Sequence, residues 1–200
     1  MEVLQHESYP DEYHGIHSRT VFGFWLFLLS DLIFFGALFA VFAVLRSSTF
    51  GGPSIRDITH LPFTMFETLI LLTSSLTAGF GGASAHRKNK VGMIFWFLMT
   101  FILGAIFLCL ELGDMIVLSI KGHSWEKSAF LSGYFTLIGT HALHVIFALL
   151  WTILLLIQVF YEKNVFIHIR RLTCLRMFWQ FVNIIWFFIF VFVYLIGVKG

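Results

Sequence analysis

Five long runs of apolar residues dominate the chain, and short polar stretches separate them. The runs cover 21–45, 61–85, 91–118, 129–160 and 172–198. Each is long enough to cross roughly 30 Å of hydrocarbon, which takes about 20 residues of helix. Because lipid offers the backbone no hydrogen-bond partner, these runs are expected to be helices. The short connections favour antiparallel neighbours. The pattern predicts an all-α integral membrane protein with five transmembrane helices in an antiparallel bundle.

The domain organisation follows from the same pattern. The first twenty residues are polar and acidic, unlike a cleavable signal peptide, so the first apolar run is expected to remain as a span. The loop after that run contains the turn residues Gly51-Gly52-Pro53. No repeat or second domain is visible. We expect a polar N-terminal segment at 1–20 and one five-helix membrane domain at 21–200.

The composition agrees with a chain that faces lipid. Hydrophobic residues make up 58% and charged residues only 12%, whereas a soluble domain has about a quarter of its residues charged. The formal net charge of +2 is too small to suggest a nucleic-acid partner. Cys109 lies in an apolar run and Cys174 near the opposite side of the membrane, so we do not expect them to form a disulfide.

The distribution of Lys and Arg predicts an orientation. Eight lie on the side of the N-terminus and five on the other, which by the positive-inside rule favours an inner N-terminus and an outer C-terminus. Tyr134 and Tyr194 fall near predicted span ends, where aromatic side chains anchor helices at the interface. The eight basic residues are Arg19, Arg87, Lys88, Lys90, Lys163, Arg170, Arg171 and Arg176, and the five are Arg46, Arg56, Lys121, Lys127 and Lys199.

Ionisable residues at membrane depth are costly and need an explanation. Asp31 lies near the middle of the first run, and His141 and His144 lie at a similar depth in the fourth. Their i, i+3 spacing places the two histidines on one helix face. These three residues are candidates for buried polar contacts or for proton handling.

Further polar residues form two groups. Glu67 in the second run, with Glu111 and Asp114 in the third, is expected to form an outer acidic cluster that has no buried histidine at matching depth. Gln180 and Asn183 in the inner half of the fifth run are expected to make structural polar contacts.

Three interpretations compete for these residues. They could be interhelical hydrogen-bond contacts, a proton relay or carboxylate antenna, or a metal or haem site. Two histidines one turn apart on one helix cannot bind opposite sides of a haem iron, and no other complete ligand set is visible. The residues alone therefore predict no catalytic, cofactor-binding or metal site.

Two packing motifs complete the pattern. Ser75, Gly79 and Ala83 form a small-xxx-small row, which we expect to pack within this chain's own bundle. Trp179 and Trp186 lie one heptad apart and are expected to be packing residues rather than part of a cofactor site.

Several strings, in this order and spacing, resemble subunit III of the haem-copper terminal oxidases over almost the whole chain beyond residue 20. The Gly-Gly-Pro loop and the Leu-Pro-Phe start are most similar to the bacterial cytochrome bo-type ubiquinol oxidase. The strings are Gly23-Phe24-Trp25, Ser30-Asp31-Leu32-Ile33-Phe34-Phe35, Gly51-Gly52-Pro53, Leu61-Pro62-Phe63 with Glu67-Thr68, Leu103-Gly104-Ala105 with Glu111 and Asp114, Gly139-Thr140-His141-Ala142-Leu143-His144-Val145, Phe178-Trp179-Gln180-Phe181-Val182-Asn183-Ile184-Ile185-Trp186 and Val193-Tyr194-Leu195-Ile196-Gly197.

The resemblance implies a non-catalytic subunit of a proton-pumping enzyme that oxidises quinol and reduces oxygen to water in the bacterial inner membrane. It implies that subunit I holds the haems and copper, that another subunit binds quinol, and that this chain holds no redox centre. It also implies packing beside subunit I, association with subunits II and IV, and phospholipid binding. Such a subunit supports assembly and sustained proton uptake. The N-terminus would be cytoplasmic and the C-terminus periplasmic.

The resemblance extends to single residues. Asp31 matches the family's buried first-helix carboxylate, which is often Glu, and the shorter side chain weakens any relay role. His141 and His144 match the fourth-helix pair. Gln180 and Asn183 stand where the family usually has His and Asp, and neither can carry a negative charge. Glu111 and Asp114 match polar positions late in the third helix.

Two alternatives remain open at this stage. One is subunit III of a cytochrome c oxidase, since neither electron-donor site would lie in this chain. The other is an independent small transporter, which would more often show inverted repeats or helices broken near the midplane. The three prolines, Pro10, Pro53 and Pro62, lie outside every helix centre, and no duplicated half is visible.

Overall fold

The computed structural model describes residues 11–49, 61–87, 89–161 and 166–195, with the side chains of 11–18 and 166–169 excepted. Parts of four predictions lie outside this range: the Gly51-Gly52-Pro53 turn, residues 1–10 of the N-terminal segment, residues 196–198 of the fifth run, and the basic residues Arg56, Lys88, Lys163 and Lys199. The described part is helical, with α1 at Asp11–Leu45, α3 at Leu61–His86, α4 at Lys90–Ile120, α5 at Ala129–Tyr161 and α6 at Phe166–Ile189, followed by the π-helix η1 at Phe190–Leu195.

The predicted fold class is confirmed. Five helices of the described part are long and apolar enough to cross a membrane, and their spans are Arg19–Leu45, Leu61–His86, Lys90–Ile120, Ala129–Tyr161 and Arg170–Leu195. Helix α1 begins eight residues before its span, so the helix extends into the polar N-terminal segment. Large apolar side chains such as Ile33 and Val44 are about three-quarters exposed on the outside of the bundle, which suits a surface covered by lipid.

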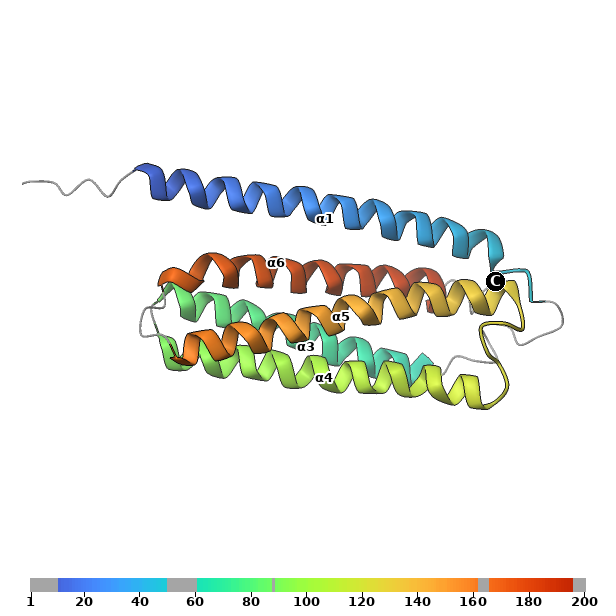
Figure 1. Ribbon diagram of the computed structural model, residues 1–200. Coiled ribbons are helices and arrows are strands. Elements are labelled where there is room, and N and C mark those ends of the chain that lie inside the picture. Colours follow the sequence, from blue (N-terminus) through green and yellow to red (C-terminus); the bar gives the residue numbers. More distant parts are fainter. Residues whose placement is uncertain (1–10, 50–60, 88, 162–165, 196–200) are drawn as a thin grey trace, which may run out of the picture.

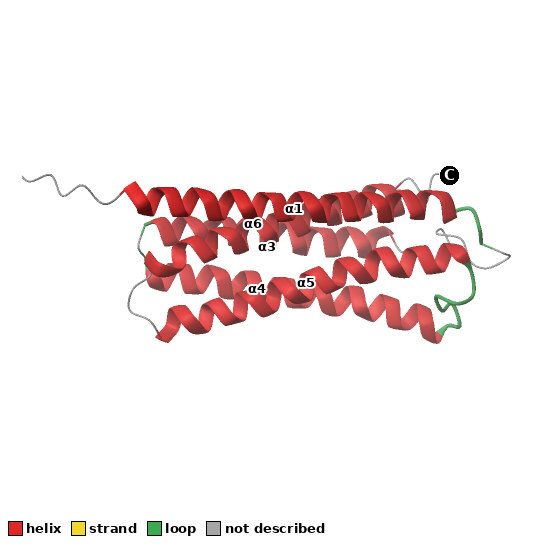
Figure 2. Cartoon of the chain, turned by 45° about the horizontal axis from the view of Figure 1, so that its top comes forward, coloured by secondary structure: helices red, strands yellow, loops and turns green. Residues whose placement is uncertain are grey.

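The helices lie roughly parallel to one long axis, and helices that follow one another in sequence run in opposite directions (Figure 1). Helices α3, α4, α5 and α6 form a four-helix bundle, in which α3 packs on α4 and α6, and α5 packs on α4 and α6. Helix α1 packs against α5 and α6 on the outside of this bundle. The described connections lie at the two ends (Figure 2), so polar groups midway along the helices depend on each other for partners.

Both ends of α4 are fixed by local hydrogen bonds. The side chain of Asn89 accepts a hydrogen bond from Gly92 N at the start of α4. At its end, Gly122 has φ +83°, and the amides of Gly122 and His123 donate to Ser119 O and Leu118 O. This is a Schellman motif, which needs the left-handed residue that glycine supplies.

The core is aromatic and contains its own polar contacts. Trp179 and Trp186 are each 2% exposed. The indole N–H of Trp179 donates to Ser74 Oγ at 3.1 Å, and that of Trp186 donates to Thr68 Oγ1 at 3.1 Å. Both tryptophans therefore join α6 to α3, as expected of packing residues with a buried N–H that needs an acceptor.

The predicted packing of the small-residue row is wrong. Ser75 and Gly79 are half-buried, Ala83 is exposed, and a Cβ atom on Gly79 would meet nothing within 4 Å. The buried small residues of α3 belong to neighbouring rows and are Ser74, Ala78, Gly81, Gly82 and Ala85. Small residues occur on several faces of this helix, so the four-residue spacing did not identify the face that packs.

Candidate functional site

The most polar part of the interior is centred on α5, where His141 and His144 project from successive turns. The side chain of His141 is fully buried and that of His144 is 20% exposed. Each imidazole contacts one carboxylate from another helix and one backbone carbonyl. We call these contacts the His141–Glu111 pair and the His144–Asp31 pair.

The His141–Glu111 pair joins α5 to α4 and α6. Nδ1 of His141 lies 3.2 Å from Glu111 Oε1, and Nε2 lies 3.3 Å from Val182 O. The ring also packs against Trp186, with centroids 5.1 Å apart, and edge-on against Phe107. The Glu111 side chain is only 3% exposed, so the contact is closed to solvent and lipid.

The hydrogen-bond chemistry of this pair requires a shared proton. A backbone carbonyl only accepts, so Nε2 of His141 carries a hydrogen and donates to Val182 O. The contact between Nδ1 and Glu111 then needs a second proton, carried either by the imidazole or by the carboxyl group. In both arrangements the pair has no net charge, which removes most of the penalty for an ionised group at this depth.

The His144–Asp31 pair repeats this arrangement between α5 and α1. Nδ1 of His144 donates to Thr140 O at 2.8 Å, so its hydrogen is committed to the backbone. Nε2 faces Asp31 Oδ2 at 3.5 Å, which is within ion-pair distance but is not aligned as a hydrogen bond. The Asp31 side chain is 17% exposed. This pair is therefore looser than the His141–Glu111 pair and more accessible from outside the chain.

The expectation that Glu111 has no histidine at matching depth is wrong. Glu111 lies nine residues before the end of α4, and His141 lies twelve residues after the start of α5, measured from the same end of the bundle. At 1.5 Å per residue these depths are about 14 Å and about 18 Å. The two side chains span that difference. Counting the depth of Glu111 from the start of its own run, which lies at the opposite end of the bundle, placed it too close to the surface.

The three residues of the expected acidic cluster come from α3 and α4. Glu67 is 2% exposed, and its Oε1 has no hydrogen-bond partner in the described part of the chain. The carboxyl groups of Glu67, Glu111 and Asp114 are close enough to interact electrostatically. Glu111 thus belongs both to this group and to the His141–Glu111 pair.

A tyrosine pair lies near this group and was not predicted. Tyr134 and Tyr194 were expected at the interface, but they are 8% and 7% exposed, and their hydroxyl oxygens lie 3.0 Å apart. They join α5 to η1. Each lies near the end of a span in the sequence, which is also where interfacial anchors occur, so position alone did not separate the two roles.

The polar residues of α6 do not act as a pair. Asn183 is buried, and its Nδ2 donates to Trp179 O within the same helix at 2.8 Å. Its Oδ1 has no hydrogen-bond partner in the part of the chain that the structure describes. Gln180 is exposed on the outside of α6. The i, i+3 spacing therefore places one amide inside the bundle and the other on its surface.

Among the described residues, no group of three or more His, Cys, Asp or Glu side chains could hold a metal ion. Cys109 is exposed, Cys174 is buried, and both are free thiols. The fold and these contacts define a class: a multi-pass helical membrane protein in which two histidines on one helix each face a carboxylate from another helix.

Comparison with known proteins identifies the family. The family model for cytochrome c oxidase subunit III matches residues 5–198. The chain belongs to the cytochrome c oxidase subunit III family.

Three relatives illustrate its range. The chain is 43% identical to cytochrome bo(3) ubiquinol oxidase subunit 3 of Pseudomonas aeruginosa, over 94% of this chain and 90% of the relative. It is 39% identical to cytochrome c oxidase subunit 3 of Bacillus sp. PS3, over 100% and 98% of the two chains. It is 33% identical to quinol oxidase subunit 3 of Bacillus subtilis, over the full length of both.

Proposed function

We propose that this chain is the non-catalytic subunit III of a proton-pumping terminal quinol oxidase. The observation that carries the proposal is the match to the subunit III family over residues 5–198, together with 43% identity to a relative named as a ubiquinol oxidase subunit. In this proposal the chain braces subunit I, which holds the haems and copper, and associates with subunits II and IV. Another subunit binds the quinol, and this chain binds phospholipid.

A test of this role is to prepare the oxidase with and without this chain. Without it, we expect the remaining enzyme to keep its haem spectrum and to begin oxidising quinol at the normal rate. Activity should then decline during turnover, because proton uptake by subunit I is no longer supported. Loss of the haem spectrum on removing the chain would contradict the absence of a redox centre here.

The relative from Bacillus sp. PS3 favours a second candidate, because it is named as a cytochrome c oxidase subunit and is 39% identical. The two candidates differ only in the electron donor. Rates measured with reduced quinol and with reduced cytochrome c on the purified complex separate them. We expect turnover with quinol.

The two histidine–carboxylate pairs are the residues we assign to the supporting role. The His141–Glu111 contact requires a proton shared between the two side chains, because Nε2 of His141 already donates to Val182 O. In the His144–Asp31 pair the two side chains face each other at 3.5 Å without a hydrogen bond. The more exposed His144–Asp31 pair is the better candidate for exchanging its proton, and the buried His141–Glu111 pair for joining helices. Glu67 and Asp114 add two further carboxyl groups to the set of ionisable side chains that includes Glu111.

The first prediction separates proton exchange from simple bracing. In Asp31→Asn the amide N–H can donate to His144 Nε2, so the contact is kept while the exchangeable carboxyl proton is lost. Turnover should start normally. If the pair exchanges protons, proton uptake by the oxidase in reconstituted vesicles should then decline with time.

The control for this prediction is Asp31→Leu, which removes the contact as well as the carboxyl group. If the pair only joins helices, Asp31→Asn should keep both stability and sustained proton uptake, and only Asp31→Leu should lower the thermal stability of the complex. Unchanged uptake in Asp31→Asn would therefore contradict the relay assignment and leave the packing role.

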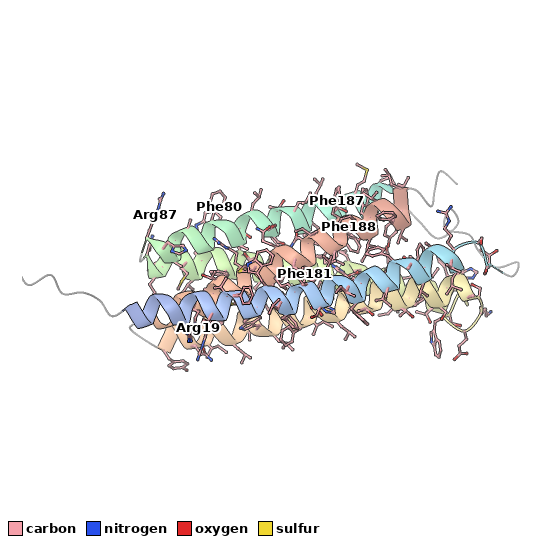
Figure 3. All side chains as sticks on the ribbon, turned by 90° about the horizontal axis from the view of Figure 1, so that it is seen from above. Arg19, Phe80, Arg87, Phe181, Phe187 and Phe188 are labelled. Atoms are coloured by element: carbon pink, nitrogen blue, oxygen red, sulfur yellow. The ribbon has the colours of Figure 1, made fainter. Side chains whose placement is uncertain are left out.

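We place the protein in the bacterial inner membrane with the N-terminus of the chain in the cytoplasm. The described cations at the end where α1 begins its span include Arg19 and Arg87, which lie at the same end in Figure 3. An excess of such residues marks the cytoplasmic side. The test is to fuse to the C-terminus a reporter enzyme that is active only after export. We expect this fusion to be active.

A further inference from the structure

An arginine within the fifth span, Arg176, packs into the space left by a glycine of α3, and we call this position the seat of the arginine. A Cβ atom added to Gly82 of α3 would lie 2.7 Å from Nη1 and 3.0 Å from Cδ of Arg176 on α6. The guanidinium group therefore occupies the space that any other residue at position 82 would fill. Gly82 is buried and Arg176 is half-buried. The seat orients the cation between two helices, whereas a basic residue at a helix end would simply extend into water.

This seat lies at the depth of lipid phosphate groups. The span of α3 has 26 residues and ends at His86. Its length of about 39 Å exceeds the roughly 30 Å of hydrocarbon, so its last turn lies in the headgroup layer. Gly82 is four residues before that end, about 6 Å inside it. Arg176 is therefore held close to the boundary between headgroups and hydrocarbon.

Among the side chains that the structure describes, no carboxylate is placed to neutralise Arg176. The acidic residues with described side chains are Asp31, Glu67, Glu111, Asp114 and Glu126. Asp31 is midway along α1, and the other four lie toward the opposite end of the bundle. A guanidinium group has five N–H donors and keeps its charge. At the headgroup boundary, a phosphate group is an anionic acceptor that matches these donors.

We propose that Arg176, seated against Gly82, binds the phosphate of an anionic phospholipid in the leaflet at this end of the bundle. Arginine matches phosphate with two parallel N–H···O contacts. The end carries further described cations, Arg19, Arg87, Lys90, Arg170 and Arg171. Basic pockets between membrane helices attract anionic headgroups.

The outer surface at this end of the bundle is apolar as well as basic. Phe80 on α3, Val91 on α4 and Phe160 on α5 are each more than half exposed, and Figure 3 places Phe80 near the same end as Arg87. Such a surface lets acyl chains lie along the helices beneath a headgroup held at this end.

The proposal rests on the phospholipid-binding part of the proposed function, and two variants test it. Arg176→Gln removes the cation, and Gly82→Ala fills its seat and pushes the flexible guanidinium away. The intact complex is purified in mild detergent through a tag on this chain. Phospholipid phosphorus per complex is then measured after extraction into organic solvent, with lipid species identified by mass spectrometry. Both variants should lose a single anionic phospholipid per complex.

Two control variants make the same kinds of substitution at positions away from Arg176 and Gly82. Arg87→Gln removes an exposed cation at the same end, and Gly79→Ala adds a methyl group where nothing lies within 4 Å. Both should retain the lipid. Unchanged lipid phosphorus in Arg176→Gln would overturn the proposal, and a fall only in water-soluble phosphate would assign a free ion instead.

Failure of this site is distinguishable from failure of the proposed function. A partner-subunit carboxylate as the acceptor would weaken co-purification in Arg176→Gln while the lipid content stays constant, which contradicts the lipid assignment alone. Absence of any oxidase subunit from the unmodified preparation would contradict the proposed function alone.

Discussion

Replacing Glu111 with leucine is expected to destabilise the protein by about 3 kcal/mol, because one partner of a buried pair is removed and the other is left without compensation. His141 would keep its contact to Val182 O, but Nδ1 would face an apolar side chain in a fully buried position. The measurement is the thermal stability of the purified complex in detergent, monitored as the fraction of this subunit that stays in the complex on heating.

Glu111→Gln is the matched control. The glutamine amide can donate to Nδ1 of neutral His141 and so replace the shared proton with a covalently fixed hydrogen. We expect its stability within about 1 kcal/mol of the unmodified protein, which is the size of one ordinary hydrogen bond. A loss equal to that of Glu111→Leu would show that the proton resides on His141 and that an ionised carboxylate is required, and would contradict the arrangement in which Glu111 carries the proton.

The second large effect is expected at Gly104, where α4 approaches the ring of Trp179. A Cβ atom there would overlap the indole and lie 3.1 Å from Leu149 Cδ2. The indole is 2% exposed and has no room to move aside. Gly104→Ala should displace Trp179 and break its hydrogen bond to Ser74. Overpacking costs about 1–3 kcal/mol, and a lost buried bond costs a similar amount.

Gly113→Ala on the same helix is the control, because a Cβ atom at that position meets nothing within 4 Å. It should be neutral or slightly stabilising, as alanine favours helix over glycine by up to about 1 kcal/mol. Thermal stability and tryptophan fluorescence of the two variants test the difference. Equal stability of Gly104→Ala and Gly113→Ala would show that α4 can move away from α6.

The fold was predictable because lipid imposes a simple rule on the sequence. Apolar runs of more than 20 residues must be helical in a membrane, and the five expected spans agree with the described ones to within a few residues. The ends were less predictable. Helix α1 begins at Asp11, in polar residues that hydropathy does not assign to a helix.

The contacts of the site were harder to predict than its residues. Asp31, His141 and His144 were recognisable because ionisable groups are rare at this depth. The partner of His141 was missed because the depth of Glu111 was counted from the far end of its run. Counted from the end that α4 and α5 share, about 1.5 Å per residue brings the two side chains to similar depths. The contacts of both imidazoles with backbone carbonyls have no signal in side-chain spacing.

Helix rotation explains the other differences. Every membrane helix here is apolar on nearly all sides, so periodicity does not show which face is buried. The row of Gly79 was expected to pack but faces outward, while Gly81 and Gly82, two and three residues further on, make the close contacts. Gln180 and Asn183 were expected to behave alike and lie on different faces of α6.

The most direct test of the proposed role is to purify the tagged chain in mild detergent and record both its partners and a reduced-minus-oxidised spectrum. We predict co-purification with a haem-bearing subunit and a haem spectrum that stays with that subunit when this chain is dissociated. A preparation containing this chain alone, or a haem that remains bound to it after dissociation, would contradict the proposed function.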